Sequence, residues 1–150
     1  MTHTFNSPIG AVLFNETDGS IIRIELTDAA GTSSAPTPLL REAEHQITAF
    51  LRGDRRQLDF PIRMVGTPFQ LRVWRALQQI PYGTTRTYGE IASAIGNPRA
   101  SRAVGMACNK NPLLLIVPCH RVVGANGKLV GFAYGTEAKR WLLELEKSIL

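Results

Sequence analysis

Residues Pro118-Cys119-His120-Arg121 place a thiol beside an imidazole and a guanidinium group. A nearby cation lowers the pKa of a thiol, and the thiolate is the form that attacks an electrophile. Pro118 fixes its own φ and lacks an amide proton, so the backbone before Cys119 is stiff. The tetrapeptide therefore predicts a cysteine nucleophile. The alternative is that Cys119 is a small apolar core residue.

The flanking sequence predicts where this thiol lies. Residues 113–117 are all apolar and predict a short buried strand. Asn126-Gly127, a few residues downstream, is a signal for the turn of a β-hairpin. We therefore expect Cys119 at the end of a strand or on the turn after it. Neighbouring side chains on a strand face opposite ways, so a water bridge or a bent backbone, rather than direct contact, is expected between Cys119 and His120.

Two short helices are expected upstream. Thr87 is a suitable N-cap for a helix over residues 88–95 that ends at Gly96. A second helix, over residues 100–109, follows the turn at Asn97-Pro98. Helix, short turn and helix form the helix-turn-helix pattern, although similar helix pairs occur in proteins that bind no nucleic acid.

The charge distribution favours nucleic acid as a partner. Residues 66–150 hold 11 lysines and arginines against 4 aspartates and glutamates, whereas residues 1–65 hold 6 against 8. A positive excess in one part of the chain indicates a polyanionic partner, although a basic protein need not have one. Arg102 also stands alone among small residues on the second helix, where it can project as a probe.

The remaining patterns predict an α+β protein. Residues 1–65 are expected to form a small N-terminal α/β scaffold domain, and residues 66–150 a mostly helical C-terminal domain with the helix-turn-helix and the active-site cysteine. The first domain is predicted to hold strands over 10–15, 21–26 and 58–62 and a helix over 38–51.

The second domain is expected to begin and end with a helix. Thr67 is a suitable N-cap for a helix that begins at Pro68. A last helix, capped by Thr136, has an apolar stripe that includes Trp141, Leu142 and Leu145, and Glu146 lies at its edge. A carboxylate there can face a polar group inside, or it can be an ordinary solvated glutamate.

Size and cysteine content exclude several classes of protein. A chain of 150 residues with 2 cysteines can bury a core without disulfides. No apolar run reaches the roughly 20 residues of a membrane helix, and the His and Cys residues lack metal-ligand spacing. We expect a cytoplasmic protein with free thiols, no metal and no membrane association.

Several motifs, in this order and spacing, resemble those of the methylated-DNA–protein-cysteine methyltransferases, the O6-alkylguanine-DNA alkyltransferases. The resemblance covers most of residues 67–147. Its motifs are Pro118-Cys119-His120-Arg121-Val122-Val123-Gly124, Tyr88-Gly89-Glu90-Ile91-Ala92, Gly96-Asn97-Pro98, Arg102-Ala103-Val104-Gly105, Asn111-Pro112 and Trp141-Leu142-Leu143. The first part of the chain matches loosely, through Asn6-Ser7-Pro8-Ile9-Gly10.

The resemblance implies direct-reversal DNA repair. Cys119 would accept the alkyl group from O6-methylguanine, or from O4-methylthymine, after the nucleotide has left the duplex. The thioether product has no good leaving group, so the transfer is irreversible, one molecule repairs one lesion and no cofactor is needed. The expected partner is double-stranded DNA carrying O6-alkylguanine, bound by a monomer.

Further roles are implied by the same resemblance. His120 resembles the base that activates Cys119 through a water, and Glu146 resembles the carboxylate that orients this histidine. Asn111 resembles the residue that braces the turn before the cysteine. Tyr88 resembles the residue that crowds the phosphate during base rotation and gives a proton toward the leaving guanine.

The resemblance also implies a DNA-binding surface. Arg102 resembles the residue that enters the base stack in place of the extruded nucleotide. Its helix would enter the minor groove, where small side chains suit the narrow space. The implied DNA-contacting residues are Arg102, Tyr88, Gly89, Asn97, Arg99, Ser101, Ala103 and Gly105.

Two features depart from the pattern of the family. Tyr134 stands where many members have glycine beside the alkyl group, so we expect methylguanine to react well and benzyl adducts poorly. Some members bind zinc in their first domain through cysteine and histidine. This chain has no cysteine before Cys108, so no structural zinc is expected.

Three other functions stay open. A non-catalytic alkyltransferase-like lesion binder typically has another residue in place of the cysteine. A helix-turn-helix regulator would bind a specific DNA sequence and need no lesion. A cysteine hydrolase would need a histidine against Cys119 and would turn over an acyl substrate.

Overall fold

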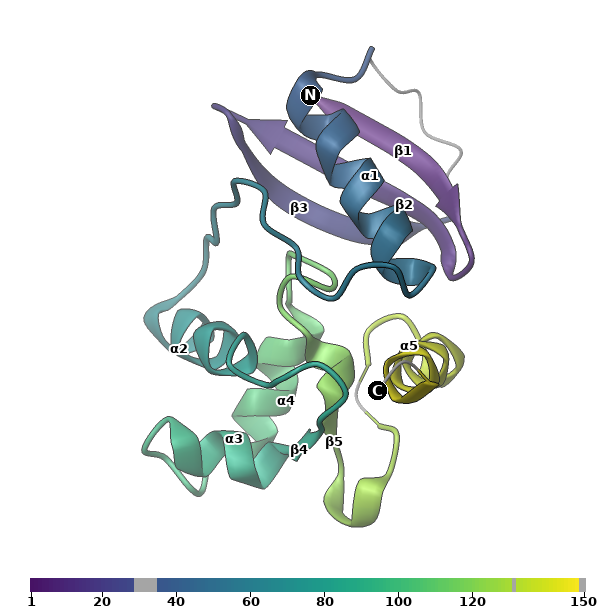
Figure 1. Ribbon diagram of the computed structural model, residues 1–150. Coiled ribbons are helices and arrows are strands. Elements are labelled where there is room, and N and C mark those ends of the chain that lie inside the picture. The colour runs from purple at the N-terminus through teal and green to yellow at the C-terminus, as the bar shows by residue number, and fades with distance from the viewer. Residues whose placement is uncertain (29–34, 131, 149–150) are drawn as a thin grey trace. The chain divides into compact units, whose positions relative to one another are not determined.

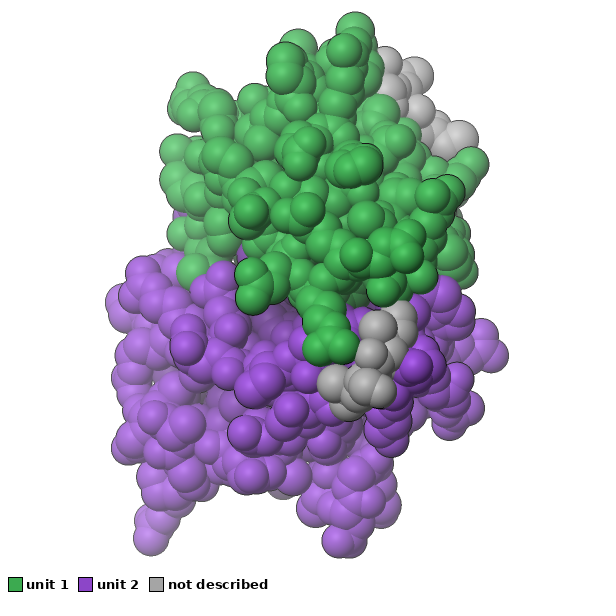
Figure 2. Space-filling model, viewed as in Figure 1, with its two compact units in different colours: residues 1–64, 112–114 green, residues 65–111, 115–150 purple. Residues whose placement is uncertain are grey.

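The chain forms two compact units in the computed structural model (Figure 2), which describes residues 1–28, 35–130 and 132–148. The first unit comprises residues 1–64 and 112–114, and the second comprises residues 65–111 and 115–150. The mixture of strands and helices agrees with the predicted α+β class. The domain boundary between residues 65 and 66 stays a prediction.

The first unit consists of a three-stranded antiparallel sheet and one helix (Figure 1). The strands lie in the order β1 (Thr2–Ser7), β2 (Gly10–Thr17) and β3 (Ser20–Thr27), and α1 (Pro38–Leu51) lies across the sheet. The predicted strands at β2 and β3 and the helix at α1 are confirmed. β1 escaped prediction because it has a single apolar residue, Phe5, among polar ones, as an edge strand can.

The predicted strand over residues 58–62 is wrong. Only an isolated bridge between Ile21 and Ile62 forms there. The buried side chain of Gln46 accepts a hydrogen bond from the Asp59 amide at 2.9 Å and donates one to the Asp59 carboxylate at 2.7 Å. A side chain therefore satisfies the backbone group that a neighbouring strand would have used.

Four helices are the main elements of the second unit (Figure 1). They are α2 (Pro68–Leu77), α3 (Tyr88–Ala94), α4 (Ser101–Asn109) and α5 (Thr136–Ser148). Thr67 and Thr87 close capping boxes on α2 and α3, as their sequence positions predicted. Trp74, 1% exposed, donates its indole proton to the Ala107 carbonyl at 2.9 Å and so joins α2 to α4.

The segment around the cysteine is more strongly bent than predicted. Leu115 has a φ of 72°, so residues 113–117 turn instead of forming a strand. Cys119–Arg121 form one 3-10 turn, and Ala125–Gly127 form another. The turn at Asn126-Gly127 exists, but the described residues on either side of it form no hairpin.

Two very short strands take the place of the predicted hairpin. β5 (Val122–Val123) pairs in parallel with β4 (Arg86–Thr87). This pairing joins the residues just after the cysteine turn to the residues just before α3. Among the described residues, no helix has the length and apolar character that crossing a membrane requires.

Candidate active site

Cys119 is the first residue of the 3-10 turn and is 4% exposed. The Asn111 side-chain amide donates to the Val117 carbonyl at 2.8 Å and to the Cys119 sulfur at 3.2 Å. The Cys119 thiol can donate to the Cys108 carbonyl, 3.6 Å away. Asn111 therefore fixes both the turn before the cysteine and the direction of its sulfur.

The thiol of Cys119 is a weak acid in this setting. Burial raises the pKa of Cys119, and contact with the Cys108 thiol raises it further. The hydrogen bond from Asn111 and the charge of Lys139 act in the opposite direction and lower this pKa. The sequence suggested a thiol with a lowered pKa, and the structure contradicts this because burial dominates.

Arg121 does not supply the cation that the sequence suggested beside Cys119. Its Nε atom donates to Glu146 Oε1 at 2.9 Å, and its Nη1 atom donates to the Ile80 carbonyl at 2.9 Å. The guanidinium group also lies over the ring of Tyr82, 5.5 Å from the centroid. The 3-10 turn therefore directs the Arg121 side chain to the Glu146 carboxylate of α5.

His120 and Glu146 form a buried pair, with relative exposures of 0% and 1%. His120 Nε2 lies 2.5 Å from Glu146 Oε2. Burial, together with the charges of Arg121 and Lys139, lowers the pKa of His120 by more than Glu146 raises it, so the imidazole is neutral at pH 7. A carboxylate only accepts, so the proton is on Nε2. Nδ1 is then an acceptor, and it is buried without a partner among the described residues.

Glu146 is ionised despite its burial. Burial alone would raise the pKa of Glu146, but hydrogen bonds from His120, Arg121 and the Gly83 amide outweigh it and bring this pKa to about 2. The carboxylate is therefore a fixed negative charge that orients the histidine.

Tyr88 and Lys139 meet at one carbonyl oxygen. The Tyr88 hydroxyl donates to the Val130 carbonyl at 2.7 Å, and the Lys139 ammonium donates to the same oxygen at 2.8 Å. The ammonium also lies 5.8 Å from the centroid of the Tyr88 ring. Burial raises the pKa of Tyr88, and negative charge on Cys108 and Cys119 adds to the effect, so the phenol keeps its proton near neutral pH.

The predicted DNA-contacting residues lie on α3, α4 and the turn between them. Asn97, Arg99 and Arg102 are exposed. A Cβ atom on Gly105 would lie 3.9 Å from the ring of Tyr88, and one on Gly89 would lie 3.8 Å from the Ser101 hydroxyl oxygen. In the part of the chain that the structure describes, the polar side chains of this group form no hydrogen bond with Cys119, His120 or Glu146.

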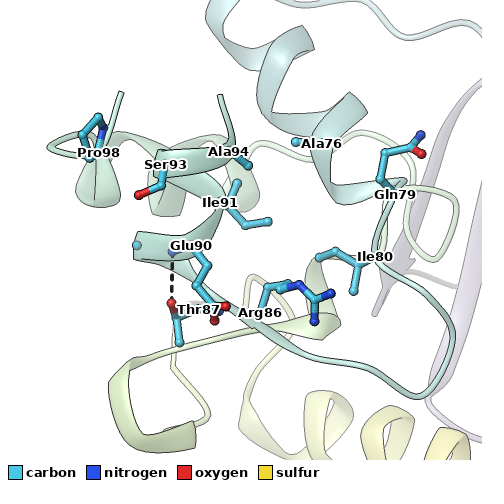
Figure 3. A pocket seen from close by; sticks show the side chains of 11 residues that line it. Ala76, Gln79, Ile80, Arg86, Thr87, Glu90, Ile91, Ser93, Ala94 and Pro98 are labelled. Atoms are coloured by element: carbon cyan, nitrogen blue, oxygen red, sulfur yellow. Dashed lines mark hydrogen bonds between the residues drawn. The ribbon is translucent and has the colours of Figure 1, made fainter. Parts of the chain in front are cut away.

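A hollow of about 920 Å³ lies beside α3 (Figure 3). Figure 3 shows Arg86 and Glu90 at one side of it, where the Glu90 amide donates to the Thr87 hydroxyl at 3.1 Å. The lining residues are Ala76, Gln79, Ile80, Arg86, Thr87, Gly89, Glu90, Ile91, Ser93, Ala94 and Pro98. None of the predicted catalytic residues lines this hollow.

One buried charged residue, Lys139, escaped prediction, whereas Arg121 was predicted beside the thiol and pairs with Glu146 instead. The apolar stripe expected on α5 is partly wrong, because Trp141 and Leu145 are only half-buried and the buried face contains Lys139, Leu142 and Glu146. These three residues are spaced i, i+3 and i+7, which places them on one helical face. The spacing of Lys139 and Glu146 around Leu142 was the sequence signal for a polar site at the buried face of α5.

Comparison with known proteins identifies the family to which this chain belongs. Residues 68–148 match the family model described as 6-O-methylguanine DNA methyltransferase, DNA binding domain. The methylated-DNA–protein-cysteine methyltransferase of Methanosarcina acetivorans is 47% identical over 150 residues, which are 96% of this chain and 96% of the relative. The constitutive methylated-DNA–protein-cysteine methyltransferase of Bacillus subtilis is 40% identical, and the match covers 96% of this chain and 93% of the relative.

A solved structure is similar over almost the whole chain. The crystal structure of Mycobacterium tuberculosis OGT in complex with DNA has 45% sequence identity and a TM-score of 0.90, with 99% of this chain and 93% of that chain covered. The similarity includes both compact units.

Proposed function

The chain belongs to the methylated-DNA–protein-cysteine methyltransferases, a family of DNA-repair enzymes, and from this premise we propose which residues carry the reaction. The enzyme acts by direct reversal, and its proposed acceptor is Cys119. The observation that supports this assignment is the position of Cys119 in a turn braced by Asn111, next in the chain to a neutral histidine held by an ionised glutamate.

The proposed base is Nδ1 of His120. It takes the thiol proton of Cys119 through one water, and Glu146 stabilises the imidazolium that forms. The sulfur attacks the methyl carbon of O6-methylguanine, an S–C bond forms, and the bond from carbon to O6 breaks. Tyr88, which keeps its proton near neutral pH, donates this proton toward the leaving guanine, and the proton held by the His120 imidazolium returns through water to the phenolate.

The proposed partner is double-stranded DNA that carries O6-alkylguanine. The related M. tuberculosis protein was crystallised with DNA. The exposed arginines of the helix-turn-helix fit phosphate and base-stack contacts, and the small residues of α4 fit close approach to a groove. A monomeric state and a cytoplasmic location stay predictions.

The intact mass of the protein after mixing with an O6-methylguanine oligonucleotide tests this assignment. We expect each molecule to gain the mass of one methylene group, on a peptide that contains Cys119, and then to stop reacting. A non-catalytic lesion binder would bind the oligonucleotide without a mass change. Repeated turnover, or modification of another residue, would contradict the proposal.

Arg102→Ala is expected to slow transfer from duplex DNA by about tenfold or more, because base rotation costs a few kcal/mol and the inserted side chain offsets part of it. Transfer from the free base O6-methylguanine should keep its rate, since no base has to rotate. Single-turnover kinetics with both substrates measure the difference. Arg140→Ala, at an exposed position of α5, is the control. Equal slowing on both substrates would contradict the proposed role.

A further inference from the structure

Lys139 of α5 is a buried cation without an acidic partner. Its relative exposure is 0%, although lysine is among the residues least often buried. No carboxylate of the described residues forms a salt bridge with it. A buried ammonium without a counter-charge is costly. The position therefore calls for a compensating negative charge.

Two backbone carbonyls hold the ammonium in place. It donates to the Val122 carbonyl of β5 and to the Val130 carbonyl. The Val130 oxygen also accepts the hydroxyl proton of Tyr88. Carbonyl dipoles and the face of an aromatic ring solvate a cation in part, but they carry no net charge. Lys139 is thus fixed in position while its charge stays uncompensated.

The acidic groups around this ammonium are the phenol of Tyr88, which keeps its proton, and the thiols. Val122 links the ammonium to the cysteine turn, because its amide donates to the Cys119 carbonyl and its own carbonyl accepts from Lys139. The charges of Cys108 and Cys119 both raise the pKa of Lys139, against the larger lowering by burial. Cys119 faces Cys108 and Asn111, and Asn111 is neutral. Arg121 and Glu146, the charged pair at His120, compensate each other. The thiolate of Cys119 is therefore the anion that the reaction creates beside Lys139.

We propose that Lys139 is a positioning residue for the transfer reaction, and that its ammonium is the counter-charge of the Cys119 thiolate. The inference rests on the proposed function, in which Cys119 is the acceptor. Before reaction, the ammonium favours the ionised sulfur in a site that otherwise opposes ionisation. After transfer, the thioether is neutral, and Lys139 again has only dipoles as partners.

The pH dependence of alkylation by iodoacetamide tests this in a Cys108→Ser background, where Cys119 is the only thiol. Lys139→Met should move the midpoint of Cys119 alkylation upward by about one pH unit, which is about a tenfold loss of thiolate at pH 7. Lys147→Met, at an exposed position of the same helix, should leave it in place. Tyr88→Phe should also leave the midpoint unchanged. This variant removes a hydrogen bond to the Val130 carbonyl but no charge, so it distinguishes the loss of the ammonium charge from the loss of a contact with Val130.

An unchanged midpoint in a folded Lys139→Met variant would overturn the proposal, even if transfer were slower. Should this variant fail to fold, NMR titration of ¹³Cε-labelled lysines in the wild-type protein replaces it. The pKa of Lys139 should be lower after stoichiometric methylation than before, and an equal pKa would overturn the proposal. Retained transfer by Cys119→Ser would instead refute Cys119 as acceptor, so the two failures are distinguishable.

Discussion

Cys119→Ser is expected to abolish methyl transfer and to leave the affinity for DNA unchanged. Serine has nearly the size of cysteine, so it fits the turn that Asn111 braces. Its hydroxyl ionises far less readily than a thiol, and a neutral hydroxyl is a poor nucleophile toward a methyl carbon. Intact mass after incubation with methylated oligonucleotide measures transfer, and fluorescence anisotropy with the same oligonucleotide measures binding.

The matched control is Cys108→Ser. Cys108 is also buried, and its thiol contacts that of Cys119. Because contact with Cys108 raises the pKa of Cys119, its replacement should leave transfer nearly intact. Loss of transfer in Cys108→Ser, with retention in Cys119→Ser, would reverse the assignment of the acceptor.

Glu146→Gln should both destabilise the protein and slow transfer. Removing one partner of a buried ion pair typically costs about 3–5 kcal/mol, because the other charge is left buried without compensation. Here Arg121 would lose its carboxylate, and His120 would lose the group that fixes its tautomer. Urea unfolding measures the stability, and single-turnover kinetics measure the rate, which should fall at least about tenfold.

The pH dependence of stability gives a second readout of Glu146. Its pKa is about 2 in the folded protein, below the ordinary value of 4.5. The unfolded chain therefore takes up a proton first as the pH falls. The stabilisation is complete above about pH 5 and is lost as the pH falls from 4.5 toward 2. It amounts to about 3 kcal/mol.

Glu144→Gln, on the exposed side of α5, is the control for both measurements. It should leave the free energy of unfolding and the transfer rate almost unchanged, because solvent screens an exposed charge. Glu146→Gln should lack most of the wild-type loss of stability between pH 4.5 and 2. An acid profile equal to that of the wild type would show that Glu146 carries no buried charge.

Local chemistry was predictable from the sequence. The caps at Thr67 and Thr87 depend on residues within one helical turn, and both formed as predicted. The turn between β2 and β3 depends on Asp18 and Gly19, whose φ angles of 51° and 77° suit the two positions of a hairpin turn. Such features need no information from distant parts of the chain.

Non-local pairing was not predictable from pattern alone. β4 and β5 have two residues each, too few to show a periodicity, and they meet from positions 86 and 122. Leu115 adopts a left-handed backbone that nothing in its apolar surroundings indicates. The resemblance to a family pointed to His120 and Glu146, whereas Lys139 was hidden because lysine is normally expected on the surface.

The burial of Cys119 has a consequence for the protein before it meets damaged DNA. A site that can be used once must remain unused until then. We expect a buried thiol with a raised pKa, 4% exposed, to react slowly with peroxides and stray alkylating agents in the surrounding water. The turn therefore protects Cys119 from side reactions. The unreacted enzyme keeps its single nucleophile until it binds the lesion.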